Sequence, residues 1–233
     1  MGRHILPATV FVTAAVLVGA GAAQNPQVQE RLAEFKQAAA GNKQALSQYT
    51  WQEKQTVSVK GEVKKQTLYQ VRMGPDGKPQ KTEIMSTPAG GGAKGGPVRR
   101  HAIEKKKGEF EQYAQQVGAL AQSYSQPDPQ RLQQAFQSGN VRLGPTGTPN
   151  EVELIVTNYL KPNDSVRFFF NRAQKAIERV EVSSYLTNPQ DAVTMQIQFA
   201  KLPDGTNHVA TSTINGVSKQ LVVQDQNSNY VRA

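Results

Sequence analysis

The period at which apolar residues recur changes several times along this chain, and each change marks an expected element. In residues 27–40 the apolar side chains fall at helical spacing with charged residues between them, which predicts a helix. Its apolar positions are Val28, Leu32 and Phe35. We expect Gly41 to end this helix and Asn42 to cap a shorter helical turn that runs to Gln48.

From Tyr49 onward apolar and polar residues alternate, which is typical of a strand with one solvated face. A turn is expected at Gly61-Glu62 and another at residues 75–78, where Pro presets φ and Gly accepts a positive φ. The segments 49–60, 63–73 and 80–86 therefore predict three neighbouring strands of an antiparallel meander.

The middle of the chain predicts a flexible segment and two helices. Residues 88–97 read PAGGGAKGGP and cannot pack, so we expect either a mobile loop between a strand and a helix or a boundary between domains. Residues 99–125 predict one long helix with a continuous apolar stripe. The stripe comprises Ile103, Phe110, Tyr113, Val117, Leu120 and Tyr124. Asp128-Pro129 predicts the start of a second helix, which ends near Ser138.

Most of the remaining sequence predicts strands joined by tight turns, including a type I′ hairpin turn at Asn215-Gly216. The total of about 10 strands is too many for a small flat sheet. The expected fold class is α+β: a curved antiparallel sheet, forming an open and incomplete β-barrel, covered by amphipathic helices.

The first 23 residues have the order of a secretory leader: a positive charge at Arg3, an apolar run, and small residues before Gln24. The apolar run is shorter than the roughly 20 residues that a bilayer crossing needs, although an uncleaved anchor remains an alternative. We expect residues 24–233 to form a single domain in the periplasm.

The amino-acid composition excludes several kinds of site and favours certain partners. The chain contains no cysteine, which excludes disulfides, thiolate metal sites, a cysteine nucleophile and a bacterial lipid anchor. The net charge of +9 favours anionic partners such as phospholipid headgroups, or simply keeps a β-rich protein soluble. The export signal argues against nucleic acid as a partner.

No motif indicates an enzyme, a metal site or a cofactor. His101 and His208 lie far apart without a second ligand nearby in sequence, so we expect lone exposed histidines, although a site assembled in space stays open. Glu151 and Glu153 share one strand face, and we expect this face to be solvated rather than catalytic.

Apolar and aromatic residues form the most informative group. A curved sheet of this size encloses more volume than its side chains readily fill, so the helix at 99–125 is expected to close over an apolar cavity or to complete an ordinary core. An acyl chain suits such a cavity. The candidate lipid-binding residues are Trp51, Tyr69, Phe110, Tyr113, Val117, Leu120, Phe168, Phe170, Met195, Ile197 and Phe199.

Basic residues at the start of the same helix are candidates for headgroup contact. The glycine-rich loop at 88–97 would let this helix move as a lid. The candidates are Arg99, Arg100, Lys105, Lys106 and Lys107. They are suited to phosphate groups, and the alternative is a solvated helix end.

The order of elements resembles that of the periplasmic outer-membrane lipoprotein carrier family, which has the LolA/LolB-like fold. The likeness rests on the leader, the opening helix, the segment 44–53 that enters a long first strand, the meander, the central helices and the closing hairpins near Tyr230. It implies an open half-barrel with a helical lid over a cavity for lipoprotein acyl chains, and a role in outer-membrane biogenesis. The lack of an anchoring cysteine resembles the soluble carrier, and the insertion at 88–97 is unusual for the family.

These observations predict a monomeric, non-enzymatic carrier or binding protein for lipids or lipoprotein acyl chains, with an envelope protein as a possible partner. An envelope sensor or structural interaction module with the same fold and no cargo is the alternative. A small outer-membrane β-barrel is disfavoured because the outward positions of the first strand are polar.

Overall fold

The computed structural model describes residues 26–75, 77–88, 97–124, 128–145 and 147–232, leaving out the side chains of 88, 97–105, 107 and 129. The expected leader and the centre of the glycine-rich segment, 89–96, lie outside the described residues. Within the described ranges the helices are α1 (Pro26–Leu46), α2 (Pro97–Tyr124), α3 (Pro129–Gln137) and the short 3-10 helix η1 (Val217–Lys219). The strands are β1 (Tyr49–Val59), β2 (Glu62–Met73), β3 (Pro79–Pro88), β4 (Val141–Leu143), β5 (Glu151–Thr157), β6 (Ser165–Asn171), β7 (Ala176–Tyr185), β8 (Ala192–Lys201), β9 (Asn207–Gly216) and β10 (Leu221–Arg232).

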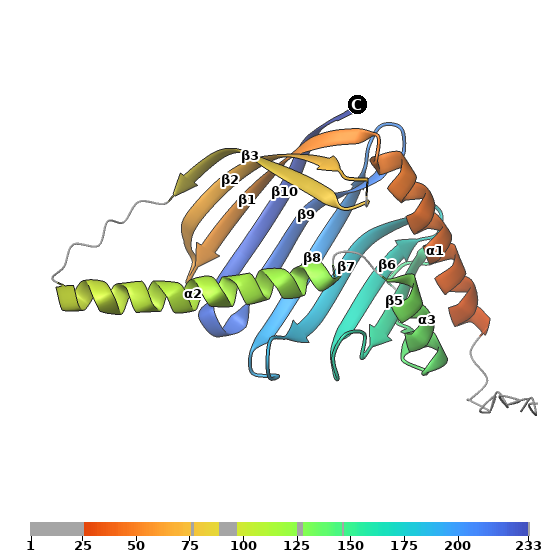
Figure 1. Cartoon of the computed structure of the whole chain (residues 1–233). Helices are drawn as coiled ribbons and strands as arrows, with labels where there is room; N and C mark the ends of the chain where they lie inside the picture. Colours follow the sequence, from red (N-terminus) through yellow and green to blue (C-terminus); the bar gives the residue numbers. More distant parts are fainter. Residues whose placement is uncertain (1–25, 76, 89–96, 125–127, 146, 233) are drawn as a thin grey trace, which may run out of the picture.

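The ten described strands form one antiparallel sheet in the order β3-β2-β1-β10-β9-β8-β7-β6-β5-β4. The sheet is open, with β3 at one edge and the three-residue β4 at the other. It curves around the face on which the helices lie (Figure 1). The expected α+β class, with an open antiparallel sheet of about ten strands, is confirmed. The strands β1 and β10, which are far apart in sequence, lie side by side in the interior of the sheet and pair from Tyr49 opposite Arg232 to Val59 opposite Leu221.

The core lies between the helices and the inner face of the sheet. Strand residues such as Val156, Phe168 and Val182 share one buried cluster with residues of all three α-helices. The helices meet mainly β4, β5, β7 and β9, so their packing concentrates on the part of the sheet between β9 and the β4 edge. In Figure 1 α2 runs across the front of the strands and α1 crosses the far end of the same face.

Helix α1 does not end at Gly41, which corrects the expectation of two shorter helices. It is continuous from Pro26 to Leu46. An exposed glycine inside a helix costs only about 1 kcal/mol relative to alanine, which packing along the rest of the helix offsets. Asn42 does not act as a cap, because its side chain binds the backbone of Asn207 on β9.

Two turns also differ from expectation. The β1–β2 turn is centred one residue earlier, at Lys60-Gly61, where φ is +53° and +80° as a type I′ turn requires. Asn215-Gly216 forms no hairpin turn, because both residues stay in β9 and Gly216 pairs with Leu221. The chain turns instead through η1 and Gln220, which is left-handed at φ +49°.

The two central helices agree with their sequence signals. Helix α2 ends at Tyr124 and α3 begins after Asp128, whose side chain accepts a 2.8 Å hydrogen bond from the Gln130 backbone N–H. Pro129 follows the cap at the first helical position, as its fixed φ favours.

Candidate functional site

The C-terminal half of α1 spans a cavity of about 1070 Å³. The N-terminal half buries its apolar stripe, ending in Phe35, against the sheet. After Phe35 the helix carries mostly small residues, so it reaches over the sheet without filling the space beneath it. This small-residue segment consists of Ala38, Ala39, Ala40, Gly41 and Ala45, all of which line the cavity.

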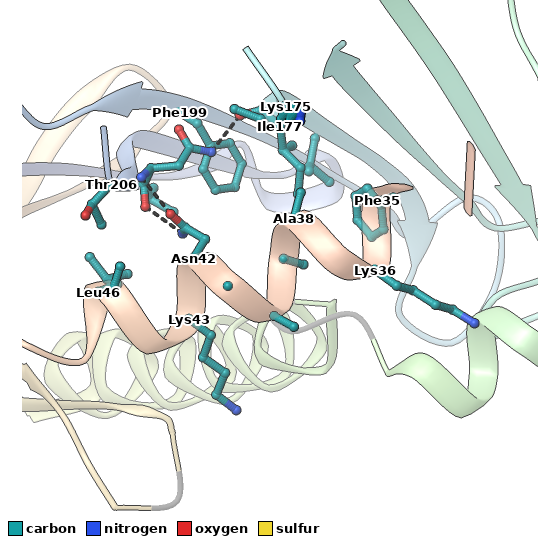
Figure 2. A pocket seen from close by; sticks show the side chains of 18 of the residues that line it. Phe35, Lys36, Ala38, Asn42, Lys43, Leu46, Lys175, Ile177, Phe199 and Thr206 are labelled. Atoms are coloured by element: carbon teal, nitrogen blue, oxygen red, sulfur yellow. Dashed lines mark hydrogen bonds between the residues drawn. The ribbon is translucent and has the colours of Figure 1, made fainter. Parts of the chain in front are cut away.

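Two contacts hold α1 in this position. Phe35 packs edge-on against Phe168 of β6, with ring centroids 4.7 Å apart. Further along, the Asn42 side chain donates to the Asn207 carbonyl at 2.7 Å and accepts from the Asn207 N–H at 2.6 Å. The Asn207 side chain donates in turn to the Ile177 carbonyl at 2.8 Å. Figure 2 shows these hydrogen bonds. Helix α1 is thus held at Phe35, before its small-residue segment, and at Asn42, within that segment.

The sheet supplies an apolar floor to the cavity. On β8 its residues are two apart, because every second side chain points to the same face, whereas on β7 they are three apart because the β6–β7 register shifts between Phe169 and Phe170. We define the apolar floor as Phe168 of β6, Ile177 and Val180 of β7, and Ile197 and Phe199 of β8. In Figure 2 Ala38 points toward Ile177, and Phe199 lies beside it. This arrangement presents hydrocarbon on both the sheet side and the helix side.

Charged residues surround the apolar floor. Among the described residues that line the cavity, four are lysines, and we call them the lysine rim. They are Lys36 and Lys43 of α1, Lys175 of the β6–β7 turn and Lys201 of β8. Asp128 and Asp204 are the acidic lining residues in the described part. The rim therefore carries more positive than negative charge.

Asp204 is held in its ionised form. Its carboxylate accepts a 2.6 Å hydrogen bond from the Tyr49 hydroxyl and a 2.9 Å bond from the Thr206 backbone N–H. These bonds, the Tyr49 bond first, lower the pKa of Asp204 to about 2. The same interaction raises the pKa of the exposed Tyr49 hydroxyl.

Three of the candidate lipid-binding residues line the cavity: Phe168, Ile197 and Phe199. The remaining eight are not among its described lining residues. Met195 is buried in the core cluster and Phe170 is also buried, so both lie on the sheet without reaching the cavity.

The apolar stripe of α2 forms core rather than a roof over the cavity. Tyr113, Val117 and Leu120 are buried in the main cluster, with the partly buried Phe110 against it. Of the expected stripe, Tyr124 lines the cavity. The role expected for the helix at 99–125 thus falls mainly to α1.

Trp51 and Tyr69 belong to a separate region of the sheet. Trp51 stacks on Tyr230 with centroids 5.4 Å apart and donates a 3.1 Å hydrogen bond to Asn227. Tyr69 lies beneath the ammonium of Lys81, 5.7 Å from its ring centre. These aromatic residues have polar partners within the sheet.

The headgroup candidates fall largely outside the described residues. The side chains of Arg99, Arg100, Lys105 and Lys107 are not described, although their backbone belongs to α2. Lys106 is exposed and is not among the described residues that line the cavity. Positive charge beside the cavity comes, among the described residues, from the lysine rim.

Two polar residues differ from the sequence prediction. Glu153 is not solvated: it is 1% exposed and receives a 2.5 Å hydrogen bond from Arg167 of β6. His208 is not exposed either, because it packs against Tyr230 with centroids 4.2 Å apart. The side chain of His101 lies outside the described residues. Neither Glu153 nor His208 lines the cavity among the described residues.

Sequence reasoning missed the contribution of α1. The spacing of Val28, Leu32 and Phe35 continues at the helical period into Ala38 and Asn42, whose side chains are smaller. This continuation was the sequence feature that could have indicated the role of α1. In the described ranges no cluster of three His, Asp or Glu side chains suits a metal ion. A separate search of those ranges found no helix with the length and apolarity needed to cross a membrane.

No protein family model matches the chain, and no curated protein matches it. Among solved structures, the fold is similar to that of a DUF1329 family protein from Desulfovibrio piger, with a TM-score of 0.40 and 11% sequence identity. The similarity covers 86% of this chain and 92% of that chain. Similarity at this level assigns neither a family nor a function.

Proposed function

We propose that this protein is a non-enzymatic binding protein or carrier for lipids or lipoprotein acyl chains. The observation that carries the proposal is the cavity between the small-residue segment of α1 and the apolar floor. Cavities that bind drug-sized molecules enclose roughly 300–1,000 Å³, so a volume of about 1070 Å³ is sufficient for a long hydrocarbon chain.

The binding energy comes from removing methylene groups from water. Each buried methylene contributes about 0.8 kcal/mol, and Ile177, Phe199 and Phe168 offer a continuous apolar surface across three strands. The helix side adds methyl groups from Ala38 and its neighbours. A chain lying under α1 is therefore in contact with hydrocarbon on two sides.

In this proposal residues 1–23 export the protein to the periplasm, where it works as a monomer without a cofactor. The resemblance to the outer-membrane lipoprotein carriers rests on the order of elements and suggests acyl chains of lipoproteins as one source of cargo. The delivery partner would be an envelope protein.

The test begins with the native protein. Organic extraction and mass spectrometry should identify a co-purifying lipid, and the delipidated full-length protein should take up a fluorescent fatty acid saturably. Absence of both the co-purifying lipid and saturable uptake would contradict the proposal.

An envelope interaction module without cargo is a second candidate. It is favoured by the edge strand β3, on which Ile84 is 52% and Met85 57% exposed, because an unpaired edge with apolar side chains can add a strand from another protein. Crosslinking in intact cells should then capture one envelope protein through β3. Loss of capture in an Ile84→Lys variant would assign the contact to this edge, and unchanged capture would contradict it.

A further inference from the structure

Among the described residues, the lysine rim has no acidic ion-pair partner. Lys36 donates to the neutral Gln133 side chain at 3.0 Å, and Lys201 donates to the Gln174 carbonyl at 2.9 Å. Among the residues that the structure describes, neither Lys43 nor Lys175 forms an ion pair, in contrast to Lys81 at Glu53. Within the described part of the chain, no ion pair therefore neutralises these four lysines.

Both acidic lining residues have hydrogen-bond or ion-pair partners outside the lysine rim. Asp128 caps α3 and lies 3.7 Å from Arg131, while Asp204 is bound by Tyr49 and Thr206. Asp204 keeps its negative charge, because its hydrogen-bond partners are neutral, so the four lysines and two aspartates of the described lining leave a net positive charge. Charges beside a low-dielectric hollow act more strongly on a ligand than the same charges on an open surface.

Lys175 and Lys201 mark one end of the apolar floor. The Lys201 ammonium donates to the carbonyl of Gln174, which is the residue immediately before Lys175. The two lysines are therefore close to each other in the fold. Ile177 follows two residues later on β7, and Phe199 precedes Lys201 by two residues on β8. Each of these two neighbouring strands therefore has an apolar floor residue two positions from a lysine, at the end of β8 and in the turn before β7. A ligand with a charged head and a long tail requires this arrangement.

From this arrangement we infer that the ligand is an anionic amphiphile, whose phosphate or carboxylate lies at Lys175 and Lys201 while its chain follows Ile177 and Phe199. The inference rests on the proposed lipid-binding function and names its substrate class. It places the headgroup at the β6–β7 turn and the end of β8, rather than at the start of α2. Lys36 and Lys43 supply further positive charge around the same cavity.

The experiment compares two lipids that share one acyl chain. Lysophosphatidic acid and the uncharged monoacylglycerol each compete with a fluorescent fatty acid for the delipidated full-length protein. We expect lysophosphatidic acid to compete about tenfold more strongly, a difference of about 1.4 kcal/mol. Equal competition by the two lipids would overturn the inference and leave the proposed function intact.

Charge variants identify the residues. In a Lys175→Gln/Lys201→Gln variant the preference for lysophosphatidic acid should fall to less than about threefold, with monoacylglycerol binding unchanged. A Lys54→Gln/Lys219→Gln variant removes the same charge from exposed positions outside the described lining and should keep the full preference. Equal loss in both variants would show a general charge effect and would overturn the assignment.

Inorganic phosphate distinguishes a lipid headgroup from free phosphate. At millimolar concentration it should leave the fluorescent fatty acid bound, because it lacks the chain that the apolar floor holds. Displacement by phosphate alone would overturn the assignment of an amphiphile. If neither lipid nor the fluorescent fatty acid binds at all, the proposed function itself fails.

Discussion

The hydroxyl of Tyr124, at the C-terminal end of α2, donates a 2.5 Å hydrogen bond to the buried carboxylate of Asp164 in the β5–β6 connection. Asp164 also accepts from the backbone N–H groups of Tyr159, Leu160 and Lys161. Ser184 of β7 lies 2.9 Å from the Tyr124 oxygen and can donate to it, since the single tyrosine proton goes to the carboxylate. Burial, followed by the Asp164 bond, raises the pKa of Tyr124. This network fixes one end of α2 to the sheet beside the cavity.

Replacing Tyr124 by phenylalanine removes one donor from a buried carboxylate. We expect Tyr124→Phe to lower the free energy of unfolding by about 1–3 kcal/mol, measured by urea denaturation. Tyr113→Phe is the matched control, because Tyr113 is also buried on α2 but its hydroxyl finds no partner among the described residues. The control should be neutral or slightly stabilising. A loss in Tyr113→Phe as large as that in Tyr124→Phe would contradict this account.

Asn42 fixes the second half of α1. Asn42→Ala removes two hydrogen bonds to the backbone of Asn207, and we expect a loss of about 1–3 kcal/mol in unfolding free energy. Hydrogen exchange should also accelerate at backbone amides of residues 38–46 relative to those near Phe35. Gln37→Ala, at an exposed position of the same helix, is the control and should leave both measurements unchanged. Uniform exchange along α1 in both variants would count against a local role for Asn42.

The small-residue segment determines the cavity volume. Ala38→Leu adds bulk on the face that lines the cavity, so uptake of the fluorescent fatty acid should weaken by about tenfold or more, while unfolding free energy stays the same or rises. Ala33→Leu adds the same bulk at an exposed position of α1 outside the described lining and should bind normally. Unchanged uptake in Ala38→Leu would show that the chain does not lie under α1.

Glu53 should give the stability a distinctive pH dependence. Burial on β1, reinforced by the negative charge of Asp225, raises the pKa of Glu53, and the partner Lys81 only partly opposes this. The fold therefore favours the neutral acid. Its contribution to stability is complete below the ordinary glutamate pKa of about 4.3 and is lost as pH rises through the raised value in the folded state. The stability of wild type minus that of Glu53→Gln should consequently decrease from pH 4 to pH 7 in urea titrations.

Glu62 provides a control of opposite sign. It is exposed, and its bond to Lys64 lowers its pKa. Its contribution is thus present above the ordinary pKa and lost as pH falls, so the difference between wild type and Glu62→Gln should increase with pH. The same direction for both variants would contradict the assignment of Glu53.

Gly144 leaves room for the buried Glu153. A Cβ at position 144 would lie well under 3 Å from the Glu153 carboxyl group, which Arg167 holds in place. We expect Gly144→Ala to cost about 1–3 kcal/mol in thermal or urea unfolding through overpacking. Gly147→Ala is the control, because a Cβ there meets nothing within 4 Å. Equal stability of the two variants would show that the Glu153 side chain moves aside freely.

The sequence predicted the strands well because their alternation records which face is buried. Phe169 illustrates this: it breaks the alternation of β6, and the structure buries it on the opposite face against the guanidinium groups of Arg167 and Arg179. The alternation of apolar residues does not reveal that β1 pairs with β10. Register between strands that are distant in sequence depends on the whole sheet rather than on local spacing.

The candidate site was predicted only in part, for a physical reason. A strong apolar stripe such as Tyr113-Val117-Leu120 indicates good packing, and good packing fills space. The cavity lies instead where α1 keeps the helical period but has alanine in place of larger residues. Alanine has high helix propensity and gives little directional signal, so the sequence predicted a helix that ends at Gly41 and a separate short turn from Asn42.

The adjacency of β1 and β10 has a consequence for biosynthesis. One side of β1 has no neighbour until the last 12-residue strand has been made. Until β10 is in place, the β1–β3 ribbon has an open edge on β1, and open strand edges can pair with other chains. Contacts that span nearly the whole polypeptide also make folding slow. Docking of β10 therefore both closes this edge and joins the two halves of the sheet.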